Sequence, residues 1–377
     1  MATLFDIFWF FLKAGAFSFG GPNSHIKLMH NELVTKKHLI GEEEFIKIKR
    51  LCNTLPGPPS MMLAMKIGYI RKGVLGQLAA LIGFILPSSL LMLVIAIYYK
   101  EFVNDNFKII DPFLYGMRTS VIAILLYTTL VYCIRYIRDF KLGAIFLVVA
   151  GAALAGLNIV LLLFLSGAAY VLLRQFSSVK KSSLMLILQA QPQFVLPVLD
   201  NQKIFWVFVK LGSLILGSGY FVFALIKMDL VDNGLFSINA LLDTVAFSLF
   251  VPGSIMVAVT FVGYIISSWQ GAALALGGAL VPIFVYSLLS STLLSRLIST
   301  ASYKLFFRGV LVASLAVLLS IIFQLGYETI GDIRQWVLFI LCMLIMFKWP
   351  KLNLLWIIII GANLGYIILH FYPLAID

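Results

Sequence analysis

The chain has 377 residues, of which 62% are hydrophobic and only 12% are charged, and its formal net charge is +12. Soluble domains carry about 45–50% apolar and about 25% charged residues, so this composition predicts an all-α polytopic membrane protein in a lipid bilayer and excludes disordered, collagen-like and disulfide-scaffold classes. The basic residues fall in short loops between apolar runs, which is typical of positive-inside loops, and we expect no nucleic-acid partner.

The first half of the chain is predicted as short, broken helices followed by longer ones. Residues 4–19 form a short apolar helix that breaks at Gly20-Gly21-Pro22, and a second short helix continues to about Val34. An amphipathic helix ends near Leu55, before Pro56-Gly57-Pro58-Pro59. The remaining helices of this half are expected from Pro58 or Pro59 to about Ile70, near 74–99, near 112–134, and as two short apolar runs within 142–173 that are parted by Gly156-Leu157-Asn158.

The second half repeats this series of elements. Phe8 to Gly15 reappears as Phe205 to Gly212, 197 positions later, and Pro87 matches Pro282, 195 positions later. We therefore expect a first repeat at 1–173, a linker at 174–203 with an extra apolar segment near 184–199, and a second repeat at 204–377. Its helices are expected at 204–217, 219–231, 238–251, 253–266, 270–295, 305–325, 335–347 and 352–371.

Loop charge indicates that the two repeats have opposite orientations in the membrane. Lys36-Lys37 and Arg71-Lys72 are basic, whereas their counterparts, Asp232-Asn233 and residues 267–270, are acidic or neutral. Other loops show the reverse, because Lys348 and Lys351 correspond to an uncharged loop of the first half. Basic loops mark the cytoplasmic side, so the repeats are predicted to be inverted, with the extra segment supplying the odd crossing.

Inverted repeats with paired broken helices are typical of transporters that bind substrate near the bilayer midplane. Each half offers two helix N-termini inside the membrane, near residues 22 and 58, then 219 and 253. An N-terminus has unsatisfied N–H donors and a partial positive charge, so we predict an anion site. A single glycine or proline would indicate only a kink; four breaks at matching positions favour a site. The candidate substrate-binding residues at the breaks are Ser18, Gly20, Gly21, Pro22, Asn23, His25, Pro56, Gly57, Pro58, Ser60, Gly217, Ser218, Gly219, Pro252, Gly253 and Ser254.

Two lysines inside apolar helices extend this prediction. Lys13 and Lys210 are equivalent in the repeat, and each stands seven residues before a break. Intramembrane lysines are costly, and their default interpretation is a functional one. Two cations and four helix N-termini suit a dianion; the alternative is that each lysine extends to the membrane surface. Lys66 has Phe261 as its counterpart, so we expect only a minor role for it.

Three acidic residues are candidates for coupling transport to protons. Glu32 and Asp229 are equivalent in the repeat, and the alternative for both is helix capping or pairing with nearby basic residues. Asp243 lies in an apolar stretch, opposite Lys47 in the other half. His25, near the first break, could donate to an anion or make a structural hydrogen bond.

Cysteine and histidine spacing predicts neither a metal site nor a cofactor. Cys52, Cys133 and Cys342 lie far apart inside helical patterns, without zinc or redox spacing. No pair of the four histidines has metal-site spacing with a third ligand.

The motifs at the breaks resemble the chromate transporter family in its long, two-domain form. The resemblance is carried by the segments Phe11 to Gly15, Ser18 to Pro22 with His25, Glu43 to Phe45, Leu55 to Pro58, Gly217 to Tyr220 with Asp229, and Pro252-Gly253. It implies export of chromate across the cytoplasmic membrane, with sulfate as a related dianion, driven by the membrane potential or a proton gradient. Two departures are Met62, where the family often has Gln, and Ser218, where Gly is expected, so another oxyanion stays open.

Other functions differ from this one in the residues that they require. An anion channel, or a transporter of a different small anion, is the nearest alternative. A membrane enzyme would need a nucleophile–base pair, a carboxylate dyad or a metal cluster, and the sequence has no such pattern. The breaks in both halves argue against a purely structural subunit. Glycine-rich faces such as Gly151 to Gly156 could pack within the chain or between two copies, so a homodimer is possible.

Overall fold

The computed structural model describes residues 3–18, 22–105, 107–175, 200–215, 219–292 and 300–371. Across these residues the chain is helical, with no strand. The expected extra segment at 184–199 lies outside the described residues, and so do Gly20, Gly21, Gly217 and Ser218 of the breaks. The side chains of Pro22 and Asn23 also lie outside the description, although the backbone of both belongs to a helix.

The described elements follow the predicted order in both halves. The first half contains α1 (Leu4–Phe17), α2 (Pro22–His30), the π-helical turn η1 (Asn31–Lys36), α3 (Glu42–Cys52), α4 (Pro59–Asp105), α5 (Phe107–Tyr136), α6 (Phe140–Leu154) and α7 (Ile159–Gln175). The second contains α8 (Asn201–Leu214), α9 (Phe221–Ile226), the π-helical turn η2 (Lys227–Val231), α10 (Ile238–Phe250), the 3₁₀ turn η3 (Ile255–Val257), α11 (Ala258–Thr292), α13 (Ala301–Thr329), α14 (Ile333–Lys348) and α15 (Leu354–Phe371). The all-α, multi-pass class is therefore as predicted.

The long helices α4 and α11 share one backbone kink. In α4 the kink lies at Lys72 (φ −145°, ψ 29°) and Gly73 (φ 59°, ψ −146°). In α11 it lies at Ser267 (φ −144°, ψ 39°) and Ser268 (φ 49°, ψ −141°). The kink separates the short and long helices that the sequence predicted on either side of these residues. Nearly equal dihedral angles at matching positions mean that the sequence repeat extends to local backbone geometry.

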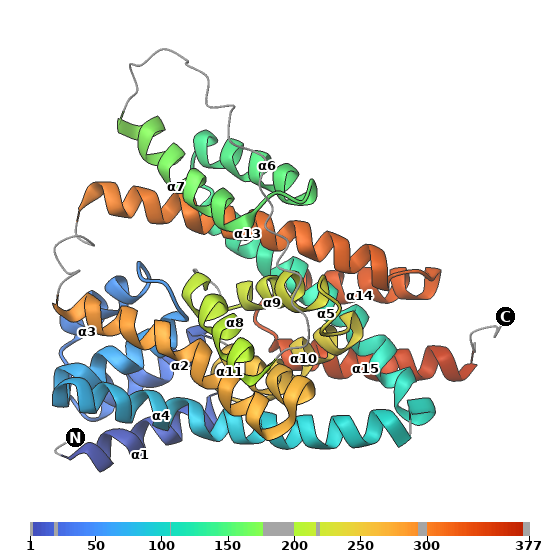
Figure 1. Ribbon diagram of the computed structural model, residues 1–377, viewed down its shortest axis with the longest axis horizontal. Coiled ribbons are helices and arrows are strands. Elements are labelled where there is room, and N and C mark those ends of the chain that lie inside the picture. The colour runs from blue at the N-terminus through green and yellow to red at the C-terminus, as the bar shows by residue number, and fades with distance from the viewer. Residues whose placement is uncertain are drawn as a thin grey trace.

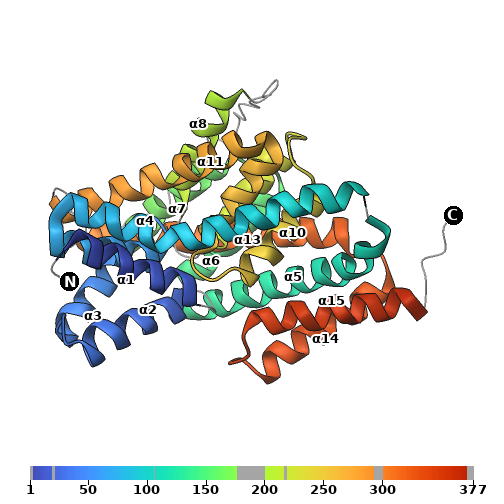
Figure 2. The same ribbon diagram turned by 90° about the horizontal axis from the view of Figure 1, so that it is seen from below.

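Matching helices also pack in matching pairs. α1 lies along α4, α8 lies along α11, and α4 and α11 contact each other at the centre. The last two helices of each half pack on the other half: α6 and α7 lie against α13, and α14 and α15 lie against α5 (Figure 1, Figure 2). The two halves are thus interlocked. Their opposite orientation in a membrane stays a prediction.

Five of the described helical stretches are long and apolar enough to cross a membrane. They are Pro59–Phe102, Ile110–Tyr136, Ile255–Ser290, Ala301–Thr329 and Leu354–Phe371. Three shorter apolar stretches, Phe140–Leu154, Ile159–Arg174 and Ile238–Phe250, have only 10–17 residues. A hydrocarbon core of about 30 Å needs about 20 helical residues, so the shorter helices reach part of the way across unless they are helped by neighbours.

Glycines let the interlocked helices approach closely. A Cβ added to Gly116 of α5 would overlap the carbonyl oxygen of Gly361 in α15 and lie 2.7 Å from Cα of Gly365. The matching glycine, Gly309 of α13, faces Ser166 and Gly167 of α7 in the same way. Close backbone approach of this kind replaces the hydrophobic effect as the force between helices in lipid.

We expect Gly116→Ala to lower the melting temperature of the purified protein, because the added methyl group must push α5 and α15 apart at a cost of about 1–3 kcal/mol. Gly151→Ala is the matched control, since it also lies within a helix and nothing is within 4 Å of its added Cβ. Thermal unfolding in detergent compares the two. Equal melting temperatures would contradict the packing described here.

Candidate functional site

The breaks of the two halves meet through two matching backbone hydrogen bonds. The N–H of Gly57 donates to the carbonyl oxygen of Ile215 at 2.8 Å, and the N–H of Gly253 donates to that of Ser18 at 3.0 Å. Gly57 and Gly253 are equivalent in the repeat, and so are Ser18 and Ile215. Each bond therefore joins the second break of one half to the first break of the other, and the four breaks lie together in pairs.

Both donor residues at these contacts have conformations that favour glycine. Gly57 has φ 118° and Gly253 has φ 98°, in the region that side chains rarely adopt. Gly253 is also crowded: an added Cβ would overlap Oγ of Ser88 and lie 3.2 Å from the carbonyl oxygen of Gly15. The close approach therefore brings a backbone N–H, a carbonyl group and a serine hydroxyl into one small region.

His25 ties the first break to the start of α4. The imidazole is buried, with Nε2 3.2 Å from the carbonyl oxygen of Ser18 and Nδ1 3.2 Å from Oγ of Ser60. A carbonyl oxygen only accepts, so Nε2 carries the hydrogen and donates, and Nδ1 accepts from the hydroxyl of Ser60. The ring also packs edge-on against Phe84 of α4, with 5.5 Å between ring centroids. The carbonyl of Ser18 thus accepts from both His25 and Gly253.

Two serine hydroxyls in this region have unused hydrogen-bonding capacity. Oγ of Ser18 and Oγ of Ser88 are buried and find no hydrogen-bond partner among the residues that the structure describes. A buried hydroxyl without a partner is costly, so each such group needs an explanation. A polar substrate that accepts both hydroxyl protons is one.

Five buried polar side chains of the first half have no polar counterpart in the second half. At the matching positions of the second half the chain has apolar residues, although the backbone contacts are alike. The positions concerned are Ser18, His25, Ser60, Gln77 and Ser88, whose counterparts are Ile215, Val222, Met256, Ala272 and Ile283. All five polar residues are buried. The repeat therefore supplies a symmetric backbone around a chemically one-sided site.

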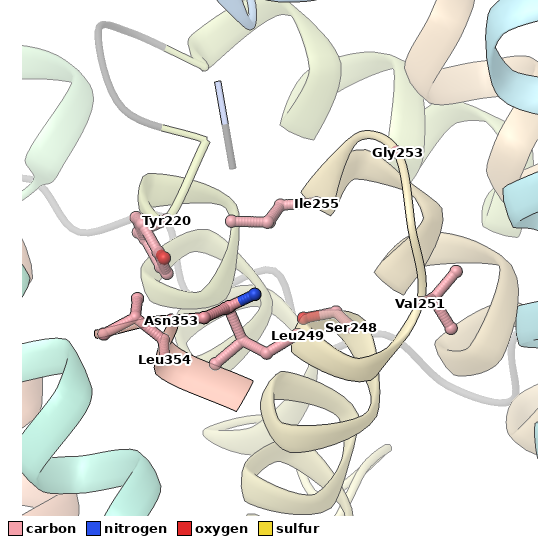
Figure 3. A pocket seen from close by; sticks show the side chains of 8 residues that line it. All are labelled: Tyr220, Ser248, Leu249, Val251, Gly253, Ile255, Asn353 and Leu354. Carbon is pink, nitrogen blue, oxygen red and sulfur yellow. The ribbon is translucent and has the colours of Figure 1, made fainter. Parts of the chain in front are cut away.

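A small pocket opens on the second-half side of Gly253. Tyr220, Asn353 and Leu354 line one side, while Ser248 and Leu249 at the end of α10 line the other (Figure 3). Its accessible space holds about one water molecule. A tetrahedral oxyanion is larger than this space.

The helix starts lie close to the predicted ones. α2 begins at Pro22 and α4 begins at Pro59. In the second half α9 begins at Phe221, and the turn η3 begins at Ile255, where the hydroxyl of Ser254 accepts from the N–H of Met256 at 3.4 Å. Pro56, Pro58 and Pro252 lie in the connections before these starts, and Gly219 lies in a turn before α9. Substrate binding by these residues stays a prediction.

The two symmetric lysines lie apart from the buried groups. Lys13 is exposed on α1, with its Nζ 5.4 Å from the ring centroid of Trp9. Lys210 is exposed on α8 and forms an ion pair with Asp229 at 2.8 Å. Both lysines lie inside helices, as the sequence predicted, but their side chains point outward from the core. Their contribution to substrate binding stays a prediction.

The acidic candidates divide into two kinds. Glu32 lies in η1, paired with Lys36 at 2.6 Å, and Asp229 lies in η2, so both halves carry an acidic residue in a π-helical turn. π-Helical turns are rare in proteins overall, but those that occur are often found at functional sites. Asp243 is different: it is fully buried and forms an ion pair with Arg118 at 2.8 Å.

Sequence reasoning missed Ser88 and Arg118. Ser88 follows Pro87, which anchored the repeat, and its counterpart Ile283 follows Pro282; the loss of a hydroxyl between halves was a signal available at that position. Arg118 lies in a predicted membrane span, where an arginine is a functional candidate by default. Within the described residues, no group of three or more His, Cys, Asp or Glu side chains could hold a metal ion.

Comparisons with known proteins agree with the resemblance at the breaks. The family model for chromate transporters matches residues 5–172 and 202–366. This chain belongs to the chromate transporter family. It is similar to a probable chromate transport protein of Synechococcus elongatus (25% identical, covering 95% of this chain and 94% of the relative) and to a chromate transport protein of Cupriavidus metallidurans (24%; 99% and 94%). A chromate transport protein of Pseudomonas aeruginosa is 28% identical over 81% of this chain and 77% of its own length.

Membership of the chromate transporter family establishes that the chain is a multi-pass membrane transporter rather than an enzyme. The relatives from Synechococcus and Cupriavidus are matched over nearly their whole length, which agrees with the long, two-domain form. No solved structure matches this chain.

We expect Gly253→Ala to destabilise the protein more than Gly234→Ala. Both residues have positive φ, at 98° and 71°, so both substitutions carry backbone strain of about 1–3 kcal/mol. Only Gly253 also has a neighbour in the way, because nothing lies within 4 Å of a Cβ on Gly234. Melting temperatures in detergent give the difference. If the two variants melt together, the crowding between Gly253 and Ser88 is not a real constraint.

Proposed function

We propose that this protein is a secondary transporter that exports chromate, or a related tetrahedral oxyanion such as sulfate, across the cytoplasmic membrane. The anion is held where the breaks of the two halves meet. The observation that carries this proposal is the pair of reciprocal backbone bonds, Gly57 to Ile215 and Gly253 to Ser18, beside two buried hydroxyls without partners among the described residues.

The chemistry of the site favours an anion over a cation. The unused groups are the hydroxyls of Ser18 and Ser88, which can donate. Helix N-termini also carry partial positive charge, and hydrogen bonds to an ionised acceptor are stronger than those to a neutral one. A tetrahedral oxyanion presents four oxygens to such donors.

The small size of the pocket beside Gly253 favours transport by alternating access. The region around Gly253 has room for about one water molecule, so a chromate ion would enter only after the halves move relative to each other. Movement at the reciprocal bonds would exchange backbone partners for the oxygens of the anion. A channel, the alternative, would need a continuous polar path.

Flux of chromate and of sulfate in proteoliposomes with an imposed membrane potential tests the function itself. We expect saturable flux that follows the potential, because the site binds one anion at a time and carries its charge across. Flux that rises linearly with anion concentration would favour a channel. Absence of flux of both anions from folded protein would refute the proposal and lead to a screen of other anions by thermal shift.

The serine hydroxyls give a sharper test of the site. We expect Ser18→Ala combined with Ser88→Ala to raise KM for chromate by about tenfold or more, since each hydrogen bond to a charged group contributes about 1.5–3 kcal/mol. Ser314→Ala is the matched control, because the hydroxyl of Ser314 is equally buried but already donates to the carbonyl of Leu311 at 2.8 Å. A KM in the double variant equal to that of the control would move the site elsewhere.

The lysine pair tests whether charge at the helix surface assists binding. We expect Lys13→Ala combined with Lys210→Ala to lower saturable flux at low salt, and this loss to shrink as salt is added, because both side chains are exposed and their charge is screened. Lys351→Ala, in an exposed loop, is the control for a general change in charge. Unchanged flux at low salt would remove the lysines from the mechanism and leave the serine site intact.

A further inference from the structure

A buried polar cluster joins three helices at a distance from the serines. The carboxylate of Asp243 on α10 accepts two hydrogen bonds from Arg118 on α5, from Nε and Nη2 at 2.8 Å each. It also accepts one from the hydroxyl of Tyr99 on α4 at 2.8 Å. This two-point contact between guanidinium and carboxylate is the strongest geometry for such a pair.

The exposure of the charged side chains decreases along the cluster. Nη1 of Arg118 lies 3.9 Å from Asp111, whose side chain is 36% exposed, while the side chains of Arg118 and Asp243 are 9% and 0% exposed. Asp111 lies two helical turns before Arg118 on the same helix. The three residues therefore form a line of charged groups from the partly exposed Asp111 near the start of α5 to the fully buried carboxylate of Asp243.

Only one half of the repeat contains this cluster. Gly116 and Gly309 make matching contacts in the two halves, so Arg118 corresponds to Leu311, and Asp243 corresponds to Lys47. Leu311 is buried and Lys47 is exposed, so the repeat does not carry this ion pair over to α13 and α3. Since buried ion pairs are often no more stabilising than apolar replacements, a role in transport explains this one better than stability.

α10 connects the cluster to the site. Asp243 stands seven residues, about 10 Å of helix, before the end of α10, and the chain then enters the break that contains Gly253. The ring of Tyr99 packs on Phe247 of α10, with 5.7 Å between centroids, and on Phe261 of α11 at 5.1 Å. A change at the cluster thus acts on the helix that positions Gly253.

Other charged groups near α10 are engaged elsewhere. On η2, Asp229 pairs with Lys210 and Lys227 pairs with Asp232. On α4, Lys100 follows Tyr99 and lies over the ring of Tyr264. The helices α9 and α11 carry no Asp, Glu, Lys or Arg, and α15 carries only His370 near its end. The groups that face Asp243 are therefore Arg118 and Tyr99, with Asp111 beyond Arg118.

We propose that Asp243 takes up one proton with each dianion bound, and that this proton frees the charge of Arg118 to attract the dianion. The inference rests on the proposed transport function. An O–H bond forms on the carboxylate as an O–H bond of hydronium breaks, and no other covalent bond changes. A buried carboxylate that loses its cationic partner cannot stay ionised, so release of Arg118 and proton uptake occur together.

The test measures sulfate binding to the purified full-length protein across about two pH units around neutrality, because sulfate stays a dianion over this range and linkage of one proton changes affinity by up to about tenfold per unit. In the wild type we expect tighter binding as the pH falls. In Asp243→Asn the carboxamide is permanently neutral, so we expect affinity to be independent of pH. Asp232→Asn is the control: it removes the carboxylate that pairs with Lys227, away from the cluster, and should keep the wild-type pH dependence.

A second variant separates coupling from folding. Arg118→Leu combined with Asp243→Asn removes both charges, and buried ion pairs are often no more stabilising than apolar replacements. We therefore expect this variant to melt like the wild type, to bind sulfate more weakly, and to show no pH dependence. Proton-driven flux in proteoliposomes should disappear in both Asp243 variants while the wild type retains it.

The outcomes distinguish the two proposals. Wild-type pH dependence that persists in the Asp243 variants would overturn the coupling role alone. If the pH dependence of binding persists in the Asp243 variants but disappears in Glu32→Gln combined with Asp229→Asn, coupling belongs to the symmetric acidic pair. Failure of the wild type to bind chromate or sulfate at any pH would refute the proposed function, and the coupling with it.

Discussion

The structure depends on one constraint: inside a bilayer, every backbone polar group needs a partner within the protein. Helices satisfy their own groups, but helix breaks do not. Here the breaks satisfy one another, because Gly57 donates to the carbonyl of Ile215 and Gly253 donates to that of Ser18. This requirement explains why the glycines are needed and why non-helical backbone lies at a contact between the halves.

A symmetric backbone carries an asymmetric set of side chains. The kinks of α4 and α11 have nearly the same dihedral angles, and the two reciprocal bonds are related by the repeat. Yet Ser18, His25 and Ser88 correspond in the repeat to apolar residues of the second half, and Arg118 corresponds to a leucine. The repeat thus accounts for the shape of the site. The unpaired substitutions account for its chemistry, with hydrogen-bond donors at the breaks and a buried ion pair on the helix that leads to Gly253.

Much of this could be predicted from the sequence, since glycine, proline and apolar runs fix where helices start and stop. The order of elements, both kinks and the meeting of breaks follow from those residues and their register. Two things could not be predicted. Nearly every residue of α1 is apolar, so the sequence did not reveal that Ile7, Phe11 and Ala14 form its buried face and that Lys13 points outward. Likewise, the partner of Asp243 stands 125 positions away, and only the packing of α5 on α10 brings Arg118 to it.

The central claim is that the oxyanion binds where the reciprocal bonds join the two halves. The most direct measurement is the position of the chromium anomalous scattering peak in crystals grown with chromate. The account predicts one peak within hydrogen-bonding reach of the Ser18 and Ser88 hydroxyls, with Gly253 beside it and the Gly253 to Ser18 bond lengthened or broken. A peak at the exposed lysines, or one within the α6–α7 pair with both reciprocal bonds intact, would contradict it.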